Sequence, residues 1–130
     1  MKKKTILLAL FIAASGMASL HAQKKYKAYI VSNAHLDTQW NWDVQTTIDE
    51  YLKNTLTRNF YLFKHYPNYV FNFEGGVKYN WIKEYYPLEY ELVKKYIKEG
   101  RWHVSGSSWD ANDTNVPSPE SFFRNILLGQ

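Results

Sequence analysis

The sequence of 130 residues contains no cysteine, so it can form neither a disulfide bond nor a lipid-modified cysteine. It has only four prolines, and it shows no internal repeat and no low-complexity linker. A chain of this length is therefore expected to form at most one domain. The one long apolar run lies close to the N-terminus, where it has the features of a targeting segment.

Residues 1–22 are predicted to be a secretory signal peptide. The basic stretch Lys2–Lys4 precedes an apolar run over Thr5–Ala14, and Ala22 offers a cleavage position. The alternative is an uncleaved anchor, but a helix that spans a membrane needs ~20 apolar residues. For an exported chain without disulfides we expect a bacterial periplasmic or secreted location, with no membrane span after cleavage.

The charge of the chain gives no indication of a nucleic-acid partner. Its formal net charge of +4 falls to +1 once Lys2–Lys4 leave with the signal peptide. Aromatic residues, in contrast, are abundant, with five Trp, eleven Tyr and seven Phe. Large aromatic side chains fill a core or stack on the C–H faces of sugar rings, and composition alone leaves both uses open.

Strand-like and helix-like segments alternate along the rest of the chain. The predicted strands are residues 27–35, 69–74 and 101–106, and the predicted helices are residues 46–66, 77–86, 88–99 and 119–130. Pro67, Pro87 and Gly100 mark helix ends, and Ser118 is an expected N-cap before Pro119. This order predicts an α/β fold in which parallel strands are joined by helical crossovers. In such sheets, chemistry collects at the carboxyl ends of the strands.

The stretch "SNAHLDTQWNWD" follows the first predicted strand and carries His35 and Asp37. On an extended backbone, residues two apart project to the same face, so imidazole and carboxylate lie side by side. Nitrogen and oxygen ligands of this kind suit zinc, although a surface histidine near a solvated aspartate is the alternative. The loop over residues 107–116 adds Asp110 and Asp113 at the same expected edge, where ordinary turn chemistry is the competing explanation. Glu74 ends the middle strand there and is assigned no role.

Several segments together resemble a known family. "AHLDTQWNWD" is similar to the His-x-Asp-Thr-x-Trp-x-Trp segment of glycoside hydrolase family 38, the α-mannosidases. "WDAND" resembles that family's Trp-x-x-x-Asp loop, and "NVPSPES" resembles its Pro-Ser-x-Glu-Ser entry to the next helix. "YNWIKEYYP" and "IKEGRWHVSG" fit the family's pattern between the first segment and this loop, in the right order. The resemblance runs from about Tyr29 to Gln130.

The resemblance implies a function and a set of roles. Residues 23–130 would be the N-terminal part of the catalytic domain, the first portion of a distorted α/β barrel, in a zinc-dependent retaining enzyme that hydrolyses terminal α-mannosides of glycans. His35, Asp37 and Asp113 match zinc ligands, and Asp113 also matches the nucleophile. Trp40 matches an aromatic residue beside the bound sugar, and Asp37 is expected to contact mannose hydroxyls as well.

Two of the family's functional groups have no matching position in this sequence. They are a further histidine ligand and the carboxylate that serves as acid and base, so we expect the chain to be the front of a longer protein. Two other functions stay open at this stage. A metal-dependent carbohydrate deacetylase also combines His and Asp ligands on an α/β barrel, and a non-catalytic glycan-binding module would keep zinc without an acid.

Overall fold

The computed structural model describes residues 26–130. The predicted signal peptide, residues 1–22, lies outside the described residues. Residues 26–30 have no regular secondary structure and exposed side chains, whereas residues 31–130 form one compact unit. Within the described range, no helix is long and apolar enough to cross a membrane.

The compact unit alternates strands and helices as the sequence predicts. Its elements are β1 (Ser32–Asn33), α2 (Val44–Thr46), the π-helix η2 (Thr47–Leu52), α3 (Lys53–His65), β2 (Phe71–Glu74), α4 (Gly76–Tyr85), α5 (Pro87–Lys98), β3 (Trp102–Ser105) and α6 (Pro119–Gly129). Every predicted element is present, and α2, η2 and α3 together fill the first predicted helix. Apart from the first strand, the bounds agree within two residues.

The first strand is much shorter than the predicted segment 27–35. Only Ser32 and Asn33 pair with β2, opposite Phe71 and Asn72. Because β2 itself begins at Phe71, residues 27–31 have no strand residue opposite them. A β-branched and aromatic segment is a strand only where a partner supplies the hydrogen bonds, so the prediction for residues 27–31 is wrong. It is also wrong for Ala34 and His35, which do not pair with β2 although that strand extends to Glu74.

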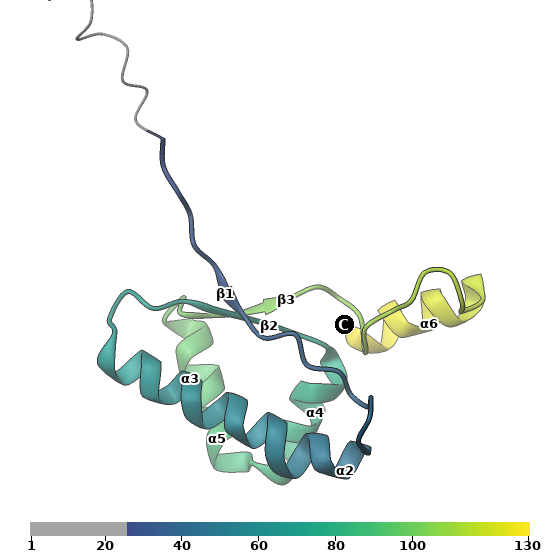
Figure 1. Ribbon diagram of the computed structural model, residues 1–130, viewed down its shortest axis with the longest axis horizontal. Helices are drawn as coiled ribbons and strands as arrows, with labels where there is room; N and C mark the ends of the chain where they lie inside the picture. The colour runs from purple at the N-terminus through teal and green to yellow at the C-terminus, as the bar shows by residue number, and fades with distance from the viewer. Residues whose placement is uncertain (1–25) are drawn as a thin grey trace, which may run out of the picture. The chain divides into compact units, whose positions relative to one another are not determined.

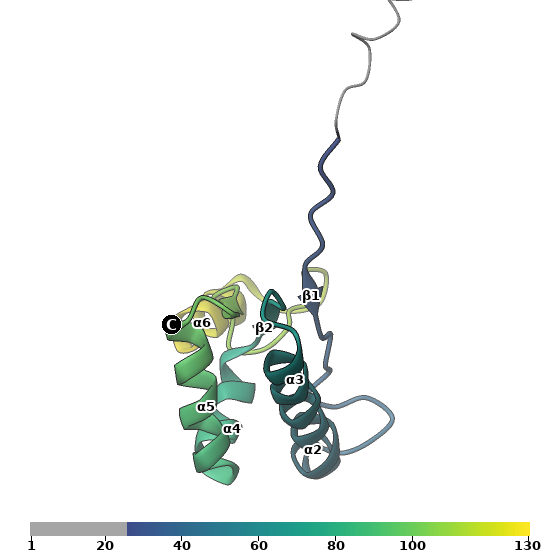
Figure 2. The ribbon, with the colours of Figure 1, turned by 90° about the vertical axis from the view of Figure 1, so that its left-hand side faces the viewer.

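The three strands form a parallel sheet in the order β1-β2-β3, which confirms the α/β class. Figures 1 and 2 show α3, α4 and α5 on one face of the sheet, with no helix over the opposite face in the part of the chain that is described. The sheet is open over residues 31–130 and does not close into a barrel. All three carboxyl ends therefore meet at one accessible edge.

Aromatic side chains from the sheet fill the space beneath it. Phe71 and Phe73 of β2 and Trp102 of β3 are almost fully buried, and Phe71 meets Trp102 edge-on at 4.9 Å between ring centroids. The Tyr79 hydroxyl donates to the Phe73 carbonyl (2.9 Å) and accepts from Trp102 Nε1 (2.9 Å). Burial also raises the pKa of Tyr79, because the phenolate would lose its hydration. These contacts hold β2 and β3 in place and so fix the positions of their carboxyl ends.

Candidate functional site

The candidate site lies at the carboxyl edge of the sheet, and strand register decides which residues meet there. Asn33 pairs with Asn72, and Glu74 pairs with Ser105. Continuing the β1 register by two residues brings His35 beside Glu74. One hollow at this edge is lined by residues of all three strand ends, among them His35, Glu74 and Ser105.

The His35 ring lies between two carboxylates. Its Nε2 is 3.2 Å from Asp37 Oδ1, and its Nδ1 is 3.9 Å from Glu74 Oε1. The side chains of His35, Asp37 and Glu74 are 72%, 38% and 46% exposed, so ligands from solution can reach all three. His35 and Asp37 lie side by side, as predicted, and Glu74 of the next strand lies beside His35.

The segment after β1 is tied to the helix that follows it. Trp42 Nε1 donates to Thr47 Oγ1 (2.7 Å), and that hydroxyl donates to the Thr38 carbonyl (2.9 Å). Trp42 also packs on the Tyr51 ring at 4.7 Å, so the second tryptophan of the motif is a structural residue. Trp40, in contrast, is 69% exposed, which leaves its indole face open to a ligand.

The loop between β3 and α6 is held in place from two sides. The first two amide groups of α4 donate to the carbonyls of Ser108 (3.0 Å) and Trp109 (2.9 Å), which satisfies donors that a helix leaves free at its N-terminus. From α6, the Asn125 carboxamide oxygen accepts from the Asp110 amide (2.9 Å), and its nitrogen donates to the Asp110 carbonyl (2.9 Å). The same nitrogen also donates to Asn112 Oδ1.

The two aspartates of this loop have different surroundings. Asp110 accepts from Thr38 Oγ1 (2.6 Å) and from the Ala111 amide (2.8 Å), so it connects the loop to the segment that carries His35. Asp113 is exposed, and its Oδ1 accepts from the Asn115 amide (2.9 Å) in a local turn. Asp110 thus has the expected turn contact within its own loop and a second contact with Thr38 in the segment after β1.

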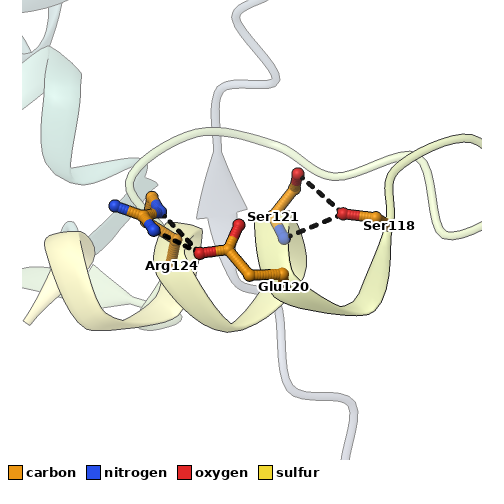
Figure 3. A network of polar contacts seen from close by, with 4 residues as sticks. All are labelled: Ser118, Glu120, Ser121 and Arg124. Atoms are coloured by element: carbon orange, nitrogen blue, oxygen red, sulfur yellow. Dashed lines mark hydrogen bonds and ion pairs between the residues drawn. The ribbon is translucent and has the colours of Figure 1, made fainter.

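The helix that supplies Asn125 begins as its sequence indicates. Ser118 is the N-cap and accepts from the Ser121 amide (3.2 Å), and Pro119 follows at the first helical position. Arg124 pairs with Glu120 one turn earlier on the exposed side of the same helix. Figure 3 shows both contacts on α6. The cap fixes the residue at which the loop ends and α6 begins, and thereby the position of Asn125 relative to the loop.

The structure brings together part of the predicted zinc set. Among residues 26–130, no group of three or more histidine, aspartate or glutamate side chains is arranged to hold a metal ion. His35 and Asp37 lie side by side, whereas Asp113 lies outside their cluster. The roles of His35, Asp37, Asp113 and Trp40 stay predictions.

One charged residue at this edge has no counterpart in the sequence-based predictions. Lys78 of α4 is 1% exposed, and none of the ion pairs within 4.0 Å among the described residues includes it. Burial lowers the pKa of Lys78 below its usual 10.5, and attraction to Asp110, Glu74 and Asp37 partly opposes that shift. One buried ammonium group is therefore attracted by three carboxylates that follow or end three different strands, and helical periodicity gives no signal of it.

Comparison with known proteins adds an independent finding. Residues 25–130 match the family described as glycosyl hydrolases family 38, N-terminal domain. The chain is 31% identical over 110 residues to alpha-mannosidase G of Dictyostelium discoideum, which covers 85% of the chain and 10% of that protein. It is 25% identical over 108 residues to human alpha-mannosidase 2C1, a match that covers 83% of the chain and 10% of that protein. It is 30% identical over 104 residues to the alpha-mannosidase of Saccharomyces cerevisiae, a match that covers 78% of the chain and 9% of that protein. The chain thus spans about a tenth of the length of these relatives.

Proposed function

This chain belongs to glycosyl hydrolase family 38, and on that premise we propose that the protein is a zinc-dependent, retaining α-mannosidase that removes terminal α-mannose from glycans. The observation that carries the proposal is the His35–Asp37 pair at an open sheet edge, within a chain whose relatives are named alpha-mannosidases. Polar side chains at a strand edge and an exposed indole three residues after Asp37 suit a sugar substrate.

The distance between the His35 and Asp37 side chains tests whether the residues at the edge fit the proposed zinc, and it supports the fit. Two ligands bound 2.0–2.2 Å from a tetrahedral zinc lie roughly 3.3–3.6 Å apart. His35 Nε2 and Asp37 Oδ1 are separated by 3.2 Å, close to that range. An imidazole nitrogen paired with a carboxylate is also a ligand set that zinc accepts. We therefore assign His35 and Asp37 to the metal. Asp113, which lies outside their cluster in this structure, is proposed as a third ligand on the resemblance of its loop to that of the family.

Each residue has a separate role in the proposed reaction. When bound, zinc supplies a positive charge that orients sugar hydroxyls and favours the ionised form of a neighbouring carboxylate. Asp113 acts as the nucleophile, its carboxylate oxygen bonding to the anomeric carbon as the glycosidic bond breaks. Retaining chemistry also requires a carboxylic acid ~5–5.5 Å from the nucleophile to protonate the leaving oxygen. Trp40 offers its exposed ring to a sugar face.

The nucleophile assignment is tested by comparing two aspartates of one loop. In the full-length protein, Asp113→Asn should lower α-mannosidase turnover by at least ~10³-fold, the scale on which loss of a covalent nucleophile acts. Asp110→Asn is the matched control, because Asp110 binds Thr38 and its own loop, and it should retain most turnover. Turnover of an aryl α-mannoside by both variants measures this. Equal losses in the two would refute the assignment, and sugar binding without turnover by the unaltered protein would indicate a glycan-binding module.

We also propose export to a bacterial periplasm or beyond the cell, supported by the basic and apolar composition of residues 1–22. Protein recovered from the exported fraction should begin within a few residues of Gln23. N-terminal sequencing measures this directly. Intact Met1 on the exported protein would refute cleavage.

A further inference from the structure

Glu74 is a carboxylate at the sheet edge that has no role in the motifs or in the proposed reaction. It ends β2, and its Oε1 lies 3.9 Å from His35 Nδ1, while His35 Nε2 faces Asp37 at 3.2 Å. The imidazole therefore has a carboxylate at each of its two nitrogens. Each carboxylate reaches the ring from a different segment of the chain.

The shape of the imidazole ring separates the two carboxylates by role. The lone pairs of its nitrogens point to opposite edges of the ring, so one ion cannot bind both of them. An ion shared by His35 Nε2 and Asp37 thus leaves Nδ1 free to carry a proton and donate it. Glu74 lies on the side of that proton.

We propose that Glu74 is a positioning residue: when the metal is bound, it accepts the Nδ1–H of His35, closing a gap that is 3.9 Å in this structure and beyond hydrogen-bond length, and it thereby fixes the imidazole so that Nε2 faces the metal. The inference rests on the proposed zinc site and deepens it. A histidine that binds a metal through one nitrogen commonly donates from the other to a carboxylate, which fixes its tautomer and makes it a stronger ligand. Here the carboxylate comes from the neighbouring strand.

The backbone and one buried charge hold Glu74 in this place. Glu74 pairs with Ser105 of β3, so its strand end is fixed in the sheet. Gly75 follows with φ +90°, a conformation that lets the chain turn into α4 at once, and an added Cβ there would lie 3.2 Å from Lys78 Nζ. The Lys78 ammonium is buried beneath this turn and is attracted by Glu74, Asp110 and Asp37. Its positive charge favours the ionised form of Glu74.

The test compares two carboxylates at the sheet edge, Glu74, which lies beside His35, and Asp110, which accepts from Thr38. Glu74→Gln removes the acceptor charge beside His35 and keeps the side-chain shape, whereas Asp110→Asn removes an equal charge from the carboxylate bound to Thr38. Both variants and His35→Ala are made in the full-length protein. Zinc affinity is measured by competition with a chelator, and the visible spectrum of the Co²⁺-substituted protein reports ligand strength. The melting temperature of each metal-free variant monitors folding.

We expect Glu74→Gln to weaken zinc binding roughly 10- to 100-fold and to shift the Co²⁺ absorption. Its metal-free melting temperature should be no lower than that of Asp110→Asn, since both changes remove a charge that attracts Lys78. Asp110→Asn should change zinc affinity by less than about threefold, because the Asp110 carboxylate accepts from Thr38 and Ala111 and forms no ion pair with His35. Equal weakening by both variants would show a general charge effect and overturn the inference. Loss of zinc with His35→Ala alone would overturn it and leave the proposed function standing. Retention of zinc by all three variants would refute the zinc site itself.

Discussion

Asn125 offers the sharpest test of how the loop that carries both aspartates is held. Replacing Asn125 by alanine removes three side-chain hydrogen bonds, two to the Asp110 backbone at 2.9 Å and one to Asn112. The backbone bond from the Trp109 amide to the Asn125 carbonyl (2.8 Å) remains. Each lost bond contributes ~0.5–1.5 kcal/mol net. The loop is half-buried, so water replaces part of the lost hydrogen bonding. We expect the free energy of opening the loop to fall by about 2–3 kcal/mol.

This cost predicts how fast the amide hydrogens of the loop exchange with solvent. Since 1.4 kcal/mol is a factor of ten, amides of residues 106–112 should exchange roughly 30- to 160-fold faster in Asn125→Ala. Hydrogen–deuterium exchange of the full-length protein, read by mass spectrometry, measures this peptide by peptide. Peptides from α3, which shares no hydrogen bond with the Asn125 side chain, serve as the internal reference.

A neighbouring variant separates this effect from a general weakening of α6. Arg124→Ala removes an exposed pair with Glu120, worth ~0.3–0.5 kcal/mol, so its loop should exchange at most about twice as fast. The reasoning would be refuted by an Asn125→Ala loop that exchanges within threefold of the wild type. It would equally fail if Arg124→Ala accelerated the same peptide to the same extent.

Two further predictions concern the supports of the site. Because burial lowers the Lys78 pKa, the folded state holds fewer protons than the unfolded state between the lowered value and 10.5, so folding stability rises with pH there. Lys78→Met should therefore melt higher than the wild type at neutral pH, and this gap should narrow as the pH approaches 10.5; a gap that is constant with pH would contradict this. A Cβ at Gly129 would overlap backbone atoms of Ser107, Ser108 and Trp109, which cannot rotate away. Gly129→Ala should cost ~1–3 kcal/mol and lower the melting temperature, and an unchanged value would show that α6 is not packed as described.

Local signals in the sequence determined most of the helix and strand bounds. Pro67, Pro87 and Gly100 ended helices within two residues of the observed positions, and Ser118 capped α6 as predicted. The pairing of His35 with Asp37 also followed from their spacing of two residues. Each of these features depends on backbone geometry within one or two turns, and a short window of sequence contains that information.

Contacts between distant segments were decided only by the tertiary structure. The length of β1 depends on where β2 begins, and the meeting of Glu74 with His35 depends on the register between those strands. Lys78 reads as a polar residue of a helix, yet it is buried because α4 starts directly beneath the sheet edge. Asn125 contacts its loop only because α6 folds back onto it. Register and burial are set by which elements pack together, and that choice minimises the free energy of the whole unit rather than of any short segment.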